Sequence, residues 1–358
     1  MRAARPCRPS RDSAVPPLTL DEFIARLPKA ELHVHLEGSI EPATVVELAS
    51  RHGVSLNVKE AAARYAPGDF SQFIESFKWV TSFLRNPNDY ALIAERLAES
   101  LRRQNVFYAE VTLSVGVMFW RKQDPAANFT AIEKAVARVP DIRVGWAFDC
   151  VRQFGAAAAM EVARLAGSLR APSIVAFGMG GDELAMPATD FRRAYEFAAG
   201  AGLHRLVHAG EIGGADSVRE AVEILGAERI GHGIGAMHHE RTMDFLAARG
   251  IPLEICPTSN LRTGALARQL GIASARVEQH PLFAFFRRGV PVTLSTDDPA
   301  MFETSLNREY AQAARLGLST DNLVSIAESG FLHAFLPVAE KQALLSKFRA
   351  GAAAPGLV

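Results

Sequence analysis

Eight short runs of β-branched and aromatic residues recur along the chain, and longer segments with helical spacing of apolar positions separate them. Strands that alternate with helices form parallel βα units. Eight such units within about 270 residues predict a (β/α)8 barrel, whose active site is expected at the carboxyl ends of the strands. The runs are residues 30–36, 106–114, 143–150, 173–180, 205–210, 229–234, 251–256 and 291–296.

The segments between these runs carry amphipathic patterns with defined ends. We expect one helix within residues 190–202 to close on Gly202, one within residues 216–227 to open on an Asp-Ser cap, and one within residues 280–289 to end in Arg-Arg-Gly. After residue 300 the pattern predicts several terminal helices.

A long insertion follows the first predicted strand, because about 70 residues separate it from the second and one crossover helix needs far fewer. In this insertion Phe70, Phe73, Phe77 and Phe83 follow mostly helical spacing. Such a stripe is typical of a helix that packs on the barrel. An insertion after the first strand also lies beside the barrel mouth, where it can act as a lid. Phe73 and Phe77 are therefore candidate substrate contacts as well as packing residues.

The composition indicates an ordinary globular protein. The chain has 358 residues, of which 49% are hydrophobic, and its 39 basic and 39 acidic side chains give a formal net charge of zero. Such a balance provides no sequence-independent attraction to nucleic acid or to an anionic membrane, so neither partner is expected. The sequence leaves the oligomeric state open. No apolar run approaches the roughly 20 residues that span a bilayer.

The cysteines and the N-terminal segment point to the cytoplasm. Cys7, Cys150 and Cys256 are few, odd in number and free of Cys-x-x-Cys spacing, which argues against disulfides and against a thiolate zinc site. Residues 1–17 are rich in Arg and Pro and lack the apolar centre of a secretory signal, so we expect a disordered tail. Residues 18–358 would then form a single barrel domain.

Two histidines are the first candidates for chemistry. His33 and His35 occupy alternate positions of the first predicted strand, so their side chains project to the same side. A pair of half-buried, hydrogen-bonded histidines would give the same pattern. Partners elsewhere in the chain must decide between the two interpretations.

Polar residues follow three later strands and provide such partners. The fifth run ends in His208 and Glu211, the sixth in His232, and the eighth in Asp297 and Asp298. Taken singly, each histidine can be a satisfied core residue and each aspartate a helix cap. Taken together, they converge at one end of one barrel.

Three imidazoles and one carboxylate form a nitrogen-rich, thiolate-free set that suits one Zn²⁺ ion and leaves a position for water. Zinc lowers the pKa of such a water molecule to about 7. Glu211 and His232 then remain as acid and base. The candidate ligands are His33, His35, His208 and Asp297.

Several other kinds of site are excluded. Phosphate-binding loops and His-Glu-x-x-His are absent, as is the His-x-Glu with Pro-Cys-x-x-Cys signature of zinc deaminases. A nucleophile at Ser259 or Ser295 would need a triad that the sequence does not specify. His280 has no evident partner in the sequence.

Five motifs then identify a family. PKAELHVHLEGS, HAGE, RIGHG, CPTSN and STDDP occur in the order seen in the adenosine deaminase family of the amidohydrolase superfamily, and the resemblance runs from about residue 18 to the end of the chain. It implies that zinc is bound by the four ligands named above, that His232 orients and helps deprotonate the attacking water, that Glu211 donates a proton to purine N1, and that Asp298 accepts a hydrogen bond at N7.

These roles set expectations for charge. Protonation of N1 needs a neutral acid, so the pKa of Glu211 should be raised in a partly desolvated pocket, whereas Asp298 close to the metal should stay ionised. Related enzymes with two metals use a bridging lysine. None of the eight predicted strands carries a lysine, which favours one metal.

Departures from the adenosine-specific pattern bear on the substrate. Glu37 stands where that group has an aspartate that reaches the ribose 5′ hydroxyl, and Gly178 stands where it has another aspartate. Thr112 and Leu113 also differ from its usual residues, while Gly181 would be the glycine whose backbone N–H meets purine N3. These differences resemble the bacterial branch that includes adenine deaminases and the 6-amino-6-deoxyfutalosine deaminases of menaquinone synthesis.

We therefore favour 6-amino-6-deoxyfutalosine as the substrate, followed by adenosine or 2′-deoxyadenosine, with adenine as an alternative. Two other functions remain open at this point. One is hydrolysis of a different bond, such as an amide or a lactone, and the other is a non-catalytic purine-binding protein on the same barrel.

Overall fold

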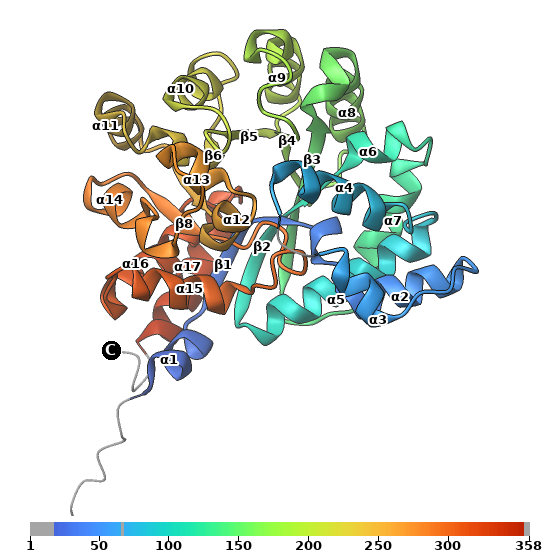
Figure 1. The fold of residues 1–358 in the computed structure, drawn as a ribbon, viewed down its shortest axis with the longest axis horizontal. Helices are drawn as coiled ribbons and strands as arrows, with labels where there is room; N and C mark the ends of the chain where they lie inside the picture. The colour runs from blue at the N-terminus through green and yellow to red at the C-terminus, as the bar shows by residue number, and fades with distance from the viewer. Residues whose placement is uncertain (1–17, 66–67, 354–358) are drawn as a thin grey trace, which may run out of the picture.

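The computed structural model describes residues 18–65 and 68–353, and its centre is a barrel of eight parallel strands in the order β1 to β8 (Figure 1). Each strand pairs with the next, and Val34 of β1 bridges to Asp297 just after β8. All eight predicted strands are confirmed. Their bounds are β1 Lys29–His35, β2 Val106–Leu113, β3 Arg143–Val151, β4 Ile174–Gly180, β5 His204–Ala209, β6 Arg229–His232, β7 Leu253–Ile255 and β8 Val292–Leu294.

Helices surround the strands and form the outer ring visible in Figure 1. Crossover helices between successive strands place both strands in the same direction, which is why the sheet is parallel throughout. Among the described residues, no helix is both long and apolar enough to cross a membrane. The crossover helices include α5 Pro87–Arg103, α7 Pro125–Val136, α8 Gly155–Leu169, α9 Arg192–Gly200, α10 Ala215–Glu223, α11 Glu240–Arg249 and α14 Leu282–Arg287.

The insertion after β1 and the helices after β8 are present as predicted. The insertion forms α2 Pro42–Arg51, α3 Val58–Ala63 and α4 Phe70–Thr81, which lead into α5. The C-terminal segment forms α15 Leu306–Arg315, α16 Thr320–Leu332 and α17 Val338–Ala352. The tail predicted for residues 1–17 lies outside the described residues.

Two sequence expectations need correction. α10 begins at Ala215 after an N-cap at Gly214, so Asp216 and Ser217 lie within the first turn and do not cap the helix. There Asp216 still complements the positive end of the helix dipole. β1 also begins one residue earlier than predicted and contains Lys29, whose Nζ donates to the carbonyls of Ile24 and Leu27 at the amino end of the strand. This lysine is therefore far along the strand from His33 and His35.

Candidate active site

A cavity of about 310 Å³ opens at the carboxyl ends of the strands. Ligand sites commonly measure roughly 300–1,000 Å³, so it can hold a nucleoside-sized molecule. The aromatic wall comes from α4 and the polar floor from the strand ends. Ten of the residues singled out from the sequence line it: His35, Phe70, Phe73, Phe77, Gly181, His208, Glu211, His232, Asp297 and Asp298.

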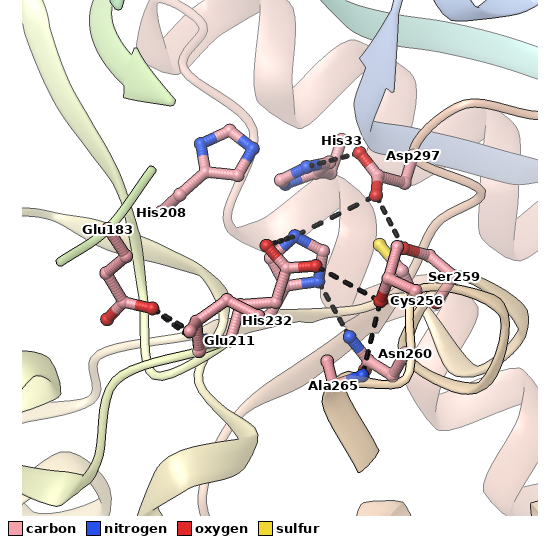
Figure 2. Close-up of polar contacts among 12 residues, drawn as sticks. His33, Glu183, His208, Glu211, His232, Cys256, Ser259, Asn260, Ala265 and Asp297 are labelled. Atoms are coloured by element: carbon pink, nitrogen blue, oxygen red, sulfur yellow. Dashed lines mark hydrogen bonds and ion pairs between the residues drawn. The ribbon is translucent and has the colours of Figure 1, made fainter. Parts of the chain in front are cut away.

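The four candidate ligands come together as predicted. One ligand atom from each of them lies within 4.8 Å of the others, and Figure 2 shows His33, His208 and Asp297 around one space, with Glu211 and His232 next to it. Nε2 of His35 lies 3.2 Å from Nε2 of His208 and 3.2 Å from Oδ1 of Asp297. Two imidazole nitrogens this close need a shared proton or a cation between them. The donor set therefore fits a divalent metal that takes nitrogen and oxygen ligands.

Partners behind the ligands fix their orientation. Nδ1 of His33 lies 2.7 Å from Glu254, whose other oxygen accepts from Arg229 at 2.6 Å, and Nδ1 of His208 lies 3.1 Å from the carbonyl of Met179. Such contacts hold the opposite nitrogen, Nε2, toward the metal position and raise its affinity for metal. Glu254 and Arg229 are buried at the centre of the barrel, where sequence pattern alone gave them no role.

The charges of His208 and Asp297 also suit a metal. Burial lowers the pKa of His208, and the neighbouring histidines lower it further, so this imidazole is neutral and can donate a lone pair. Burial alone would raise the pKa of Asp297, but hydrogen bonds from His33 and His35 reverse the direction and keep it well below its usual range. Asp297 is thus an ionised ligand, and Ser259 donates to its second oxygen at 2.6 Å.

Glu211 has the raised pKa expected of a proton donor. Burial is the main cause, and the negative charges of Asp297 and Glu183 add to it. Its Oε2 lies 3.7 Å from Nε2 of His232, and Thr263 lies 3.5 Å from its other oxygen. A neutral carboxylic acid is therefore available at the cavity floor.

Glu183, which sequence reasoning passed over, holds the loop that carries Glu211. Its carboxylate accepts the backbone N–H groups of four consecutive residues, with N···O distances of 2.5 to 3.1 Å, and the hydroxyl of Ser217 as well. Figure 2 shows Glu183 beside the backbone of Glu211. Its signal in the sequence was its place at the end of GMGGDE, residues 178–183, three residues after the fourth predicted strand. The four N–H donors are those of residues 210–213.

A hydrogen-bond chain determines the tautomer of His232. The backbone N–H of Leu282 donates to Nδ1 of His280, so His280 donates from Nε2 to Oδ1 of Asn260, and Nδ2 of Asn260 donates to Nδ1 of His232. Burial lowers the pKa of His232 and of His280 to about 3, so both rings are neutral. The remaining proton of His232 therefore lies on Nε2, the nitrogen that faces Glu211. His280, which had no evident partner in the sequence, is the first side chain in this series of hydrogen bonds.

The sequence argument expected Asp298 to stay ionised beside a bound metal, and the protein groups around it act in the opposite direction. Burial and the negative charge of its neighbour Asp297 raise its pKa well above its usual range. Like charges on adjacent buried residues disfavour double ionisation, and the sequence argument had considered only attraction to a metal. Asp298 also packs closely on Gly38, where a Cβ atom would lie 1.7 Å from Oδ1 of Asp298.

The substrate-binding candidates fall into two groups. Gly181 lines the cavity with a φ of +91°, and Phe73 and Phe77 line it from α4, where Phe73 also packs on Phe302 with ring centroids 5.2 Å apart. α4 is thus a packing helix and a cavity wall at once. Glu37 is buried, and among the described residues it is not part of the cavity lining; its carboxylate accepts the N–H and hydroxyl of Ser114.

Comparison with known proteins identifies the family to which the chain belongs. The family model for adenosine deaminase matches residues 28–350. The chain is 41% identical over 330 residues to an aminodeoxyfutalosine deaminase of Streptomyces coelicolor, covering 89% of this chain and 83% of that protein. It is 35% identical over 334 residues to an adenosine deaminase of Edwardsiella ictaluri, covering 89% and 97%.

A solved structure has the same fold. The crystal structure of an adenine deaminase from Arthrobacter aurescens superposes with a TM-score of 0.84 at 27% sequence identity, covering 90% of this chain and 98% of that one. The residues that the family model matches include His33, His35, His208, Glu211 and Asp297. The chain therefore belongs to the adenosine deaminase family and is a hydrolytic deaminase.

Proposed function

We propose that this enzyme binds one Zn²⁺ ion per chain and replaces the C6 amino group of an adenine-type nucleoside with oxygen, releasing ammonia. The observation that carries the proposal is the convergence of three imidazoles and the ionised Asp297 directly beside the neutral Glu211. A pure binding protein needs no proton donor next to a metal site. An amide or lactone hydrolase needs no pair of acids such as Glu211 and Asp298 to meet two ring nitrogens.

Zinc would be held by His33, His35, His208 and Asp297 and would supply a water molecule whose pKa is about 7. Glu211 would donate its proton to N1 as the water oxygen adds to C6, so that negative charge does not build up on the ring. His232 carries its proton on Nε2, so we assign it to donate a hydrogen bond that orients the attacking oxygen and not to accept the proton of the water. After addition, the proton of the new C6 hydroxyl would pass to N6, so that the C6–N6 bond breaks, ammonia leaves and the C6=O group forms.

Asp298 would bind N7, and the raised pKa clarifies how. N7 of a neutral purine is an acceptor, so one partner must supply a proton. A protonated Asp298 donates through its O–H, which reverses the direction of the hydrogen bond expected from the sequence. The backbone N–H of Gly181 would meet N3.

Among nucleosides we favour 6-amino-6-deoxyfutalosine. The relative with that activity in its name is 41% identical to this chain, against 35% for the adenosine deaminase. The replacements at Glu37 and Gly178 also depart from the adenosine-specific pattern.

The test is ammonia release by zinc-loaded enzyme with 6-amino-6-deoxyfutalosine, adenosine and adenine at equal concentrations, reported as kcat/KM for each. We expect 6-amino-6-deoxyfutalosine to exceed the other two by at least tenfold. A higher kcat/KM for adenosine would identify an enzyme of adenosine salvage. A higher kcat/KM for adenine would identify the free base as the substrate. Ligand binding without ammonia release by zinc-replete protein would contradict deamination itself.

A further inference from the structure

One buried acid of the cavity has no part in the proposed chemistry. Asp149 lies near the end of β3, is 4% exposed and lines the cavity. Within residues 18–65 and 68–353, its Oδ1 atom is buried and has no hydrogen-bond partner. A buried polar atom without a partner costs roughly 1–3 kcal/mol, so such an atom in an enzyme cavity indicates a group that a ligand completes.

The neighbouring strand makes room for this carboxyl group. Asp149 pairs in register with Gly178 of β4, and a Cβ atom on Gly178 would lie 2.9 Å from Oδ1 of Asp149. A Cβ atom on Gly180 would lie 3.1 Å from its Oδ2. Gly178 is also the position where the adenosine-specific pattern has an aspartate. The carboxyl group of Asp149 thus occupies space that a side chain at residue 178 would fill.

Other cavity groups account for the ring of the substrate. Two carboxyl groups that line the cavity have a buried oxygen without a partner in the described part of the chain, those of Asp149 and Asp298. Asp298 is assigned to N7, Glu211 to N1 and Gly181 to N3, which leaves no ring nitrogen that needs Asp149. The remaining polar part of a nucleoside is its sugar.

Resting on the proposed nucleoside deamination, we propose that Asp149 is a specificity-determining residue whose carboxyl group hydrogen-bonds a hydroxyl of the substrate's sugar. A hydroxyl both donates and accepts, so it can pair with either protonation state of Asp149. Burial and the nearby Glu37 raise the pKa of Asp149 well above its usual range, and contact with the Gly180 backbone opposes this. The Asp149 carboxyl group takes the place of the aspartate that is missing at Gly178.

The first test uses analogues that lack one hydroxyl at a time. We would measure kcat/KM of wild-type enzyme and Asp149→Ala with adenosine and its 2′-, 3′- and 5′-deoxy forms, or their inhibition constants against the best substrate where turnover is absent. For the analogue that lacks the hydroxyl bound by Asp149, kcat/KM of wild-type enzyme should be about tenfold lower than for adenosine. Asp149→Ala should have equal kcat/KM values for adenosine and that analogue. Zinc content should be the same in both proteins.

Thr293→Val is the matched control. Thr293 on β8 also has a buried side-chain oxygen without a partner among the described residues, but it does not line the cavity. This variant should keep the wild-type ratios for all four compounds. If Asp149→Ala lowers the values for adenosine and all three analogues by the same factor, Asp149 has only a structural role and the proposal is wrong. Absence of deamination with every 6-aminopurine would instead contradict the proposed function.

A second test moves the carboxyl group between strands. Gly178 does not have a positive φ, so its backbone accepts a side chain. Asp149→Gly should lower kcat/KM for the best nucleoside about tenfold or more, and the double variant Asp149→Gly/Gly178→Asp should recover part of this loss. Gly178→Asp alone should be impaired, because both carboxyl groups then compete for one space. A double variant no better than Asp149→Gly would overturn the shared-space argument.

Discussion

At the residue scale, the site depends on acids whose protonation the barrel interior controls. Glu211 and Asp298 are held neutral by burial and by the charge of Asp297, whereas Asp297 is ionised because two histidines bond to it. Three carboxyl groups within one cavity therefore have two different roles. Their surroundings, and not their residue type, separate the ionised carboxylate from the two carboxyl groups with raised pKa values.

Replacing Glu211 tests the proton donor. Glu211→Gln keeps the shape of the side chain and removes the acidic proton, so kcat should fall by about 10²–10⁴-fold. Zinc content, measured by metal analysis, should remain at the wild-type level because Glu211 is not a ligand. Loss of zinc together with activity would assign Glu211 to the metal site instead.

The same variant gives a stability test with a defined sign. The folded-state pKa of Glu211 is raised above its unfolded value, so its contribution to stability is present at low pH and is lost as pH rises through the folded pKa. Glutamine does not titrate, so Glu211→Gln does not lose this stability as the pH rises. In metal-free protein the Tm of Glu211→Gln should therefore exceed that of wild type at alkaline pH, and the difference should shrink on acidification.

The contact between Gly38 and Asp298 permits a second residue-scale prediction. A methyl group on Gly38 would lie 1.7 Å from Oδ1 of Asp298, so Gly38→Ala must displace that carboxyl group. A shift of about 1 Å in a catalytic group can cost on the order of 100-fold, and we expect a loss of that size in kcat/KM with zinc retained.

Gly200→Ala is the control, because nothing lies within 4 Å of a Cβ atom there and it should leave kcat/KM unchanged. Equal activity of Gly38→Ala and wild type would show that the position of Asp298 does not matter.

At the scale of elements, the polar groups of the site are held by loops at the strand ends. Glu183, just after β4, accepts the backbone N–H groups of the loop after β5 and so fixes Glu211. Asn260 in α12 Pro257–Arg262 connects His232, at the end of β6, to His280, before α14. Each connection joins neighbouring βα units, so these side chains are positioned relative to one another although they come from different loops.

One substitution can reverse the direction of the hydrogen bond between Asn260 and His232. In Asn260→Asp the donor to Nδ1 of His232 becomes an acceptor, so the proton should move to Nδ1 and leave Nε2 without one. We expect kcat to fall about 10–100-fold, with zinc retained and with changed ¹⁵N chemical shifts of the His232 ring.

His280→Gln retains a donor toward Asn260 and should lose less activity than Asn260→Asp. An unchanged His232 spectrum in Asn260→Asp would contradict the tautomer assigned from these hydrogen bonds.

At the scale of the whole molecule, the metal cluster joins distant parts of the barrel. Its ligands come from β1, from β5 and from the segment after β8, where backbone bonds of 2.7 and 3.0 Å between residues 35, 33 and 297 link the first and last strands. A metal bound there connects the two ends of the sheet. It binds the folded state and not the unfolded chain, so it stabilises the fold by mass action.

Metal removal should therefore lower stability as well as activity. Metal at 100 times its Kd contributes about 2.7 kcal/mol, so treatment with a chelator should lower Tm by several degrees and abolish ammonia release. Added Zn²⁺ should restore both. His33→Ala removes one ligand, and its Tm should respond far less to chelator and to Zn²⁺; an equal response in both proteins would locate the metal elsewhere.

The sequence by itself determined the eight strands, the helical insertion and the residues that meet at the strand ends. Strand pattern is local, and parallel βα units place all carboxyl ends at one edge, so His33, His208 and Asp297 could be expected together before any distance was known. The family motifs then implied their roles.

Only the tertiary structure decided the rest. Asp149 lies in a predicted strand, His280 lies at the start of a predicted helix, and Glu183 lies between predicted elements. Their roles depend on atoms contributed by other strands and loops. The neutral state of Asp298 depends on burial and on Asp297 beside it, which residue spacing does not measure. Spacing along a chain fixes which side chains share a face, whereas hydrogen bonding and protonation depend on three-dimensional distance and on exclusion of water.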